Sequence, residues 1–424
     1  MIAATVVLLL ALVIGVPVAF AIGLSALSYF LLSGANLLVL PQQFIGQLSN
    51  LSLISVPFFV LAGELMNRGG VTRRIFAFAE AVVGRVPGNL GHTNVVAAMI
   101  FAGMSGSAVA DLASVGKIGL KSMRDASYPD NLSLGVIISA STIGPIIPPS
   151  INMVIFGSIA NVPIGLLFLG GVLPGILTGS MIMLMFALLF WRRKVKVLEP
   201  QARQGLWPAF REAFWSLMTP VVLLGAMFTG IATPTEAAIV ATLYTLVVAG
   251  LIYRELTWAT IFEVLLSTAI VSGAILVIIG FAAPLGYVIA REQVAVGLST
   301  LLVGSFKGHV LLLFAVVALL LVVGCFMEVV AALILLTPVL GAALIATGLD
   351  PVFVGVLMVY TLGIGLVTPP VGMCLYVGSQ ISGVRLEKVV AATAPFIVPL
   401  VVTMVLMILF PSLITWLPTA VYAK

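Results

Sequence analysis

Apolar stretches long enough to cross a lipid bilayer recur along the whole chain, and they limit its possible folds more than any other feature. Residues 311–323 continue into 333–344 with a single charged residue, Glu328, between them. A membrane-spanning helix needs about 20 apolar residues. Only 8% of the 424 residues are charged, whereas a soluble domain carries roughly a quarter. The strict alternation of a membrane β-barrel is absent, so the sequence predicts an all-α polytopic membrane protein.

The positive net charge does not indicate a nucleic-acid partner. The net charge is +5, but the basic residues lie in short segments between the apolar stretches, which is typical of the cytoplasmic loops of membrane proteins. The two cysteines, Cys325 and Cys374, lie in apolar segments and indicate neither a disulfide framework nor a metal cluster. The partner that the composition predicts is the lipid bilayer.

The first 32 residues are apolar from the second residue onward. They lack the basic start and the small-residue cleavage site of a secretory signal, so we expect them to remain in the membrane. This span has room for one long helix or for two short helices hinged near residues 15–17.

A repeated pattern relates the two halves of the chain. Pro148-Pro149 recurs 221 positions later as Pro369-Pro370, and the same offset places Gly103 on Gly324. Four arginines lie within 68–85, whereas the matching segment 289–306 has one, and Arg385 and Lys388 match the apolar Ile164 and Leu167. Positive charge marks cytoplasmic loops, so matching loops lie on opposite faces of the membrane. The sequence therefore predicts two inverted-topology repeats, a common architecture of secondary transporters.

The predicted boundaries follow from this pattern. Residues 1–190 form the first repeat, 191–215 a cytoplasmic or interfacial linker rich in Arg, Lys and Trp, and 216–424 the second repeat. Thr72 to Val86 mixes Arg and Glu with Phe and Val at helical spacing, so it is either an amphipathic arm in the interface or an ordinary loop helix.

Each repeat contains a segment in which proline and glycine interrupt an apolar run. Ser141–Ser150 holds three prolines and a glycine between the short apolar stretches 132–140 and 151–160. Proline removes a backbone donor and clashes with the preceding turn, so we expect broken helices over 131–161 and, around the second Pro-Pro pair, over 351–382. Freed carbonyls at such breaks can coordinate a cation, and a half-helix N-terminus can face an anion. A pair of kinked helices without a ligand is the structural alternative.

A segment of small and polar residues precedes each broken helix. Residues 103–111 and 324–330 are predicted to form the tips of re-entrant hairpins near 95–125 and 315–348, because non-helical backbone at membrane depth must be surrounded by protein or a water-filled cavity. Asp111 and Glu328 are acids in apolar surroundings, for which function is the first hypothesis. The alternatives are that Asp111 pairs with Lys117 or caps a helix, and that Glu328 caps a helix.

At these segments the chain resembles the large membrane subunit of the tripartite ATP-independent periplasmic (TRAP) transporters. The matching stretches run through nearly the whole chain and cover residues 56–70, 101–111, 141–150, 234–238 and 365–372. The resemblance implies an elevator-type fold of the ion-transporter kind in a bacterial inner membrane. It implies sodium-driven uptake of a small organic anion, such as a C4-dicarboxylate or a sugar acid, and no enzymatic activity. It also implies two protein partners, a periplasmic substrate-binding protein and a small four-helix membrane subunit.

The resemblance also assigns candidate ligand residues. One sodium site would use Ser105, Gly106, Ser107, Gly144 and Pro148. The other would use Gly324, Met327, Glu328, Gly365 and Thr368. Substrate would lie between the two tips, with Ser150, Asn152, Thr368, Pro370 and Asp111 as its candidate contacts.

Two other functions remain open from the sequence. Gly103 to Gly106 matches the Gly-x-Ser-Gly pattern of intramembrane serine proteases, whose nucleophile needs a base within hydrogen-bond reach. The chain offers only His92, at an expected helix entrance, and His309, in an expected loop. A passive channel is the other alternative, and flux without sodium dependence would favour it.

Overall fold

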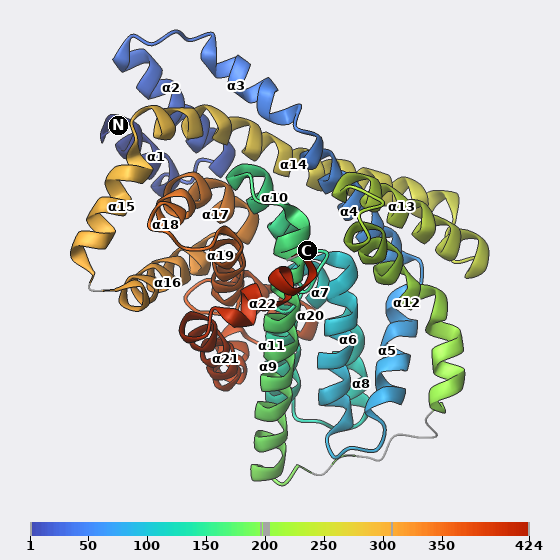
Figure 1. The fold of residues 1–424 in the computed structure, drawn as a ribbon. Coiled ribbons are helices and arrows are strands. Elements are labelled where there is room, and N and C mark those ends of the chain that lie inside the picture. The colour runs from blue at the N-terminus through green and yellow to red at the C-terminus, as the bar shows by residue number, and fades with distance from the viewer. Residues whose placement is uncertain (1, 196, 198–203, 307, 423–424) are drawn as a thin grey trace.

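The computed structural model describes residues 2–195, 197, 204–306 and 308–422, and every regular element within them is a helix (Figure 1). The helices of the first half are α1 (Ile2–Val13), α2 (Val18–Ser33), α3 (Val39–Leu48), α4 (Leu51–Arg68), α5 (Val71–Val83), α6 (Asn89–Ser105), α7 (Ala108–Asp111), the π-helical η1 (Leu112–Gly116), α8 (Lys117–Asp125), α9 (Asp130–Ser141), α10 (Ile151–Ala160) and α11 (Ile164–Arg192).

The second half of the chain is also helical. Its helices are α12 (Leu206–Phe228), α13 (Pro234–Val247), the π-helical η2 (Val248–Ile252), α14 (Trp258–Arg291), α15 (Val294–Ser305), α16 (His309–Phe326), α17 (Val329–Leu336), the π-helical η3 (Thr337–Gly341), α18 (Ala342–Ala346), α19 (Pro351–Gly365), α20 (Met373–Ser382), α21 (Leu386–Leu409) and α22 (Ser412–Tyr422).

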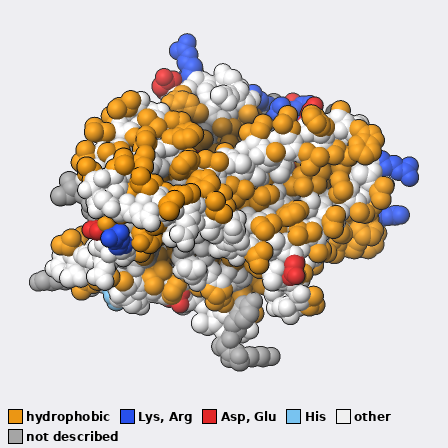
Figure 2. All heavy atoms as spheres, turned by 90° about the horizontal axis from the view of Figure 1, so that it is seen from above, with side chains coloured by type: hydrophobic (Ala, Val, Ile, Leu, Met, Phe, Trp, Pro, Cys, Tyr) orange, Lys and Arg blue, Asp and Glu red, His pale blue; other side chains and the backbone are white. Residues whose placement is uncertain are grey.

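The surface and the helix lengths both fit a bilayer. Among the described residues, seven helical segments are long and apolar enough to cross a membrane, α11 and α14 being the longest. Figure 2 shows a face covered largely by hydrophobic side chains, with charged side chains at its edges. Such a surface is stable only against hydrocarbon or protein, so the predicted all-α, multi-pass membrane protein is confirmed.

The first 32 residues form two short helices, α1 and α2, and not one long one. They are separated by a turn that contains Gly15, at φ +87°, and Pro17. Proline lacks the amide donor that a continuing helix requires, which accounts for the break.

The two proline-containing segments interrupt helices as expected. Helix α9 has 12 residues and α10 has 10, with a non-helical connection between them. Helices α19 and α20 are separated in the same way, and the bonds Pro148–Pro149 and Pro369–Pro370 are both cis. At 1.5 Å per residue, neither α9 nor α10 is long enough to span the bilayer alone.

The broken helices pack against each other in opposite directions. Near the centre, the Ser141 hydroxyl lies 3.8 Å from the Cys374 thiol. One turn from there, Ile138 of α9 lies against Gly378 of α20. Beyond the links, Phe156 of α10 lies against Gly355 of α19. The contacts along α9 and α20 show that these two helices run antiparallel.

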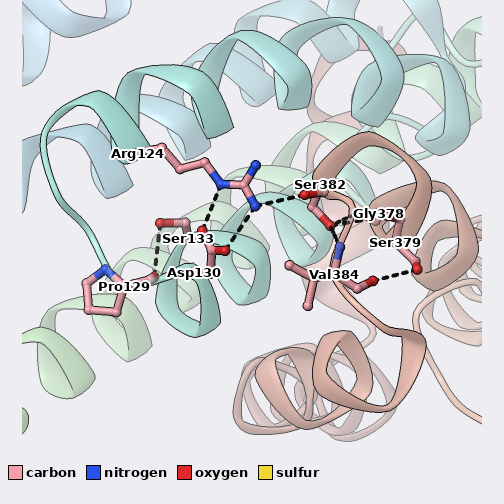
Figure 3. Close-up of polar contacts among 8 residues, drawn as sticks. All are labelled: Arg124, Pro129, Asp130, Ser133, Gly378, Ser379, Ser382 and Val384. Atoms are coloured by element: carbon pink, nitrogen blue, oxygen red, sulfur yellow. Dashed lines mark hydrogen bonds and ion pairs between the residues drawn. The ribbon is translucent and has the colours of Figure 1, made fainter.

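An ion pair at the start of α9 also binds the C-terminal end of α20 (Figure 3). The Arg124 guanidinium donates two hydrogen bonds to the Asp130 carboxylate, at 2.8 and 2.9 Å. It donates a third to the backbone carbonyl of Ser382, at 2.9 Å. Arg124 thus contacts both the start of α9 and the C-terminal end of α20.

The remaining helices form a support around this centre. Helix α14 lies across α2, α3 and α4, and α4 packs along α13 (Figure 1). Helix α5 lies against α6 and α12. Of the predicted linker, Trp191 still belongs to α11, Trp207 and Trp215 belong to α12, and residues 196 and 198–203 lie outside the described residues.

Candidate functional site

The tip of the first hairpin touches the first Pro-Pro link through its backbone. Helix α6 ends at Gly106, at φ +63°, and α7 begins after Ser107. A Cβ on Gly106 would lie 2.9 Å from the Ile151 amide nitrogen and 3.0 Å from the Pro149 carbonyl oxygen. Only glycine meets both the backbone conformation and the close approach. Predicted residues of the tip and the link are therefore brought together.

Asp111 lies behind this contact with its side chain only 2% exposed. Its Oδ1 accepts a hydrogen bond from the Ser105 hydroxyl, while its Oδ2 has no partner among the described residues. Gly144 faces Oδ2, because a Cβ there would lie 2.2 Å from it. No ion pair joins Asp111 to Lys117 among the described residues, and its side chain caps no helix.

The second tip and link also meet through glycines. A Cβ on Gly365 would lie 2.5 Å from the Gly324 Cα. The Gly372 amide donates to the Cys325 carbonyl at 3.0 Å. The Thr368 hydroxyl, in the link, donates to the Ile364 carbonyl in the last turn of α19. Glycine at both contact points lets the two backbones touch.

Glu328 caps the helix that follows the second tip. Its Oε2 accepts hydrogen bonds from the amides of Val330, at 2.7 Å, and Ala331, at 3.3 Å. The capping alternative for Glu328 is therefore observed. The carboxylate compensates the free amides of the first turn of α17, and the same residue lines the cavity between the tips.

A cavity of about 350 Å³ lies between the two tips and α14. Gly106, Ser107 and Asn152 line it from the first repeat, and Glu328 lines it from the second. Ser150, Thr368, Pro370 and Asp111, also predicted to contact substrate, are not among its lining residues. The opposite wall is apolar and was not found from the sequence. It consists of Val60 and of the α14 residues Ile270, Val271, Ala274, Ile275 and Ile278.

The two links differ in their exposure, which the repeat pattern did not predict. Helix α11 covers the first link so closely that a Cβ on Gly171 would lie 2.2 Å from the Ile146 carbonyl oxygen. At the second link, Pro369 and Pro370 are exposed. Ser150 is buried as the cap of α10 and donates its hydroxyl to the Pro145 carbonyl.

The geometry around Ser105 differs from that of a protease nucleophile. Its hydroxyl donates to Asp111 and accepts from the Ser107 amide. The His92 ring packs edge-on against Phe186, and His309 is the first residue of α16 and not part of a loop. A serine nucleophile needs a hydrogen-bonded base, and neither histidine is arranged as one.

Comparison with known proteins identifies the family. Residues 5–413 match the sequence model of the family described as "Tripartite ATP-independent periplasmic transporter, DctM component". The chain belongs to this DctM family. The resemblance noted in its motifs is thereby confirmed.

Several relatives match nearly the whole length of this DctM chain. It is 38% identical over 405 residues to the sialic acid TRAP transporter large permease protein SiaM of Vibrio cholerae, covering 95% of each chain. It is 36% identical to the 2,3-diketo-L-gulonate TRAP transporter large permease protein YiaN of Escherichia coli, again with 95% of each covered. Identity to the C4-dicarboxylate TRAP transporter large permease protein DctM of V. cholerae is 34%, over 96% and 95% of the two chains. These relatives are permeases and not enzymes, so the protease hypothesis is wrong.

Two solved transporters share the fold. The YdaH transporter of Alcanivorax borkumensis superposes with a TM-score of 0.65 over 88% of this chain and 87% of its own, at 14% identity. MtrF of Neisseria gonorrhoeae superposes with a TM-score of 0.57 over 87% and 82%, at 11% identity. At these identities the similarity concerns the fold alone.

Proposed function

We propose that this DctM permease takes up a small organic anion, a carboxylate of the sugar-acid or C4-dicarboxylate class, together with sodium. The cavity between the two hairpin tips carries the proposal. It brings Ser107 and Asn152 of one repeat to the same space as Glu328 of the other. Polar groups converging in a concave, otherwise apolar site are the usual form of a small-molecule site. The relatives are named for sialic acid, 2,3-diketo-L-gulonate and C4-dicarboxylates.

The residues around Asp111 fit a sodium ion. Its Oδ2 is buried without a hydrogen-bond donor, and an anionic oxygen in this position is costly unless a cation or proton compensates it. Carboxylate, hydroxyl and carbonyl oxygens suit hard cations. Asp111 and Ser105 supply the first two kinds. The Ser141 carbonyl oxygen lies 3.3 Å from the Cβ position of Gly144, which faces the carboxylate. Bound there, sodium would neutralise the carboxylate and hold the first tip against its link.

We propose an elevator mechanism carried by two inverted repeats. The antiparallel packing of α9 with α20 supports the inversion. The apolar wall that α14 presents to the cavity supports the movement. A wall without fixed polar contacts lets the tips slide past it without breaking hydrogen bonds. The hairpins and broken helices would form the moving body, and α14, α4 and α13 the fixed support.

We further propose that the chain works in a bacterial inner membrane with two partners. One is a periplasmic binding protein that delivers the anion, and the other is a small four-helix membrane subunit. The family description and the "large permease" names of the relatives support this assignment.

The proposal is tested by uptake into proteoliposomes that contain the purified permease and its small subunit. Radiolabelled sialic acid, 2,3-diketo-L-gulonate and succinate are each offered with the matching binding protein, under an inward gradient of sodium or of potassium. We expect accumulation above the external concentration with one of these anions, only under the sodium gradient. Equilibration without accumulation, the same in both salts, would establish a passive channel instead.

A further inference from the structure

A second, larger cavity lies away from the hairpin tips, between α5, the start of α12 and the turn after η2. Its volume is about 790 Å³. It is lined by Arg73, Arg74, Glu80, Arg211, Glu212 and Trp215, with Tyr253 at one wall. Helices α5 and α12 lie side by side there (Figure 1). No part of the transport mechanism uses this cavity.

Its charges are mixed, and three of them form no ion pair among the described residues. Arg74 is held by Glu255, at 2.8 Å, and by the Tyr253 ring, 3.7 Å from the guanidinium carbon. Arg73 also reaches Glu255, at 3.1 Å. Among the described residues, Arg211, Glu80 and Glu212 take part in no ion pair. The cavity therefore offers one guanidinium and two carboxylates that form no ion pair with each other.

Aromatic side chains adjoin the cavity along α12. The ring of Trp207 stacks on that of Phe210, with 5.9 Å between the ring centroids. The centroids of the Phe210 ring and of the Phe78 ring of α5 lie 6.0 Å apart. Phe214 and Trp215 continue the row. Trp and other aromatic rings gather at the level of lipid headgroups, and the arginines of this end mark the cytoplasmic face.

We propose that this cavity binds the headgroup of phosphatidylethanolamine. The phosphate would accept hydrogen bonds from Arg211 and Arg73, because a guanidinium matches phosphate geometry. The ammonium would donate to Glu80 and Glu212. An anionic headgroup would leave both carboxylates facing negative charge, and a choline headgroup has no N–H to donate to them. The acyl chains would follow the aromatic row towards the hydrocarbon.

Native mass spectrometry of the full chain in detergent tests the proposal. Phosphatidylethanolamine, phosphatidylglycerol and phosphatidylcholine with identical acyl chains are titrated, and the lipid-bound fraction is measured. We expect phosphatidylethanolamine to bind most tightly and Arg211→Gln to weaken it about fivefold, the size of one lost charge-assisted hydrogen bond. Arg254→Gln, another exposed arginine outside the lining, is the matched control and should leave binding unchanged.

A specificity change separates the proposed site from general loss of structure. Glu80→Gln with Glu212→Gln should shift the preference from phosphatidylethanolamine to phosphatidylglycerol, because the repelling carboxylates are gone. Equal binding of all three lipids to the unaltered chain would overturn the proposal, as would equal weakening by Arg211→Gln and Arg254→Gln. If inorganic phosphate raises the melting temperature as much as phosphatidylethanolamine does, and the rise is lost in Arg211→Gln, the site binds free phosphate and the lipid assignment is wrong.

Discussion

At the scale of single residues, a carboxylate oxygen and a glycine face each other at the centre of the molecule. Asp111 Oδ2 is buried without a donor, and Gly144 leaves it just enough room. A buried polar atom that lacks a partner lowers the stability of the fold. The sodium ion that we propose would compensate this oxygen.

Asp111→Asn should abolish stabilisation by sodium. A ligand that binds only the folded state adds about 2.7 kcal/mol at one hundred times its Kd, and the amide removes the charge that attracts the ion. The melting temperature in detergent is measured in sodium and in equal potassium. Asp125→Asn, an exposed aspartate at the end of α8, should keep the sodium-specific rise. An undiminished rise in Asp111→Asn would exclude this carboxylate as a ligand.

Gly144→Ala should destabilise the fold by about 1–3 kcal/mol, the usual cost of overpacking. The added methyl would lie 2.2 Å from Asp111 Oδ2, so the tip must move away from the link. Gly363→Ala is the matched control, since nothing lies within 4 Å of its Cβ position inside α19, and alanine favours a helix. Thermal unfolding distinguishes them, and equal melting temperatures would contradict the close contact.

At the scale of elements, the contacts that hold the two broken helices together lie at both ends and at the centre. Arg124 connects the start of α9 to the backbone carbonyl of Ser382, the last residue of α20 (Figure 3). Its hydrogen bond to Asp130 raises the pKa of the Arg124 guanidinium, which therefore keeps its charge. A basic group at a helix C-terminus also interacts favourably with the helix dipole.

Arg124→Ala should lower stability by about 1 kcal/mol, because the pair is partly exposed and screened by solvent. Arg124→Lys should recover only part of the loss, since lysine cannot make the paired hydrogen bonds to Asp130 while reaching Ser382. Arg254→Ala, at an exposed position, provides the control for removal of one positive charge. The melting temperatures of the three variants are compared, and a full recovery by lysine would mean that charge alone matters.

At the scale of the whole molecule, the hairpin tips face an apolar wall that is formed mainly by α14. Val330 and Ala274 line the same cavity from α17 and α14. If the tips move against α14 during transport, a covalent link between the two must stop them. Transport through a fixed pore would survive such a link as long as the pore stayed open.

A crosslink between Val330→Cys and Ala274→Cys should therefore abolish uptake. Both native cysteines, Cys325 and Cys374, are first replaced by serine, and uptake by that variant is the reference. The matched control joins Ala274→Cys to Ile278→Cys, one turn apart on α14, and should preserve uptake. Uptake that survives the α17–α14 crosslink would contradict movement of the tips along this wall.

Much of the architecture was predictable from the residues because the physics of a bilayer is restrictive. Backbone groups without water must pair within helices, so long apolar runs predict helices. Proline ends them, and the breaks at Pro148 and Pro369 were placed correctly. Asp111 was noticed because an acid is rare in an apolar segment.

The tertiary structure alone decided which groups become neighbours when they are distant in sequence and have no distinctive side chains. The sequence by itself determined a helical membrane protein, its two proline breaks and its small-residue tips. It did not determine that Gly144 faces Asp111, that α11 buries one link while the other stays exposed, or that Ile270 and Ala274 form the wall opposite the tips. Helix breaks follow from local backbone chemistry, which each residue carries with it. Apolar side chains in a bilayer pack equally well against lipid or protein, so their neighbours are set only when the whole chain is folded.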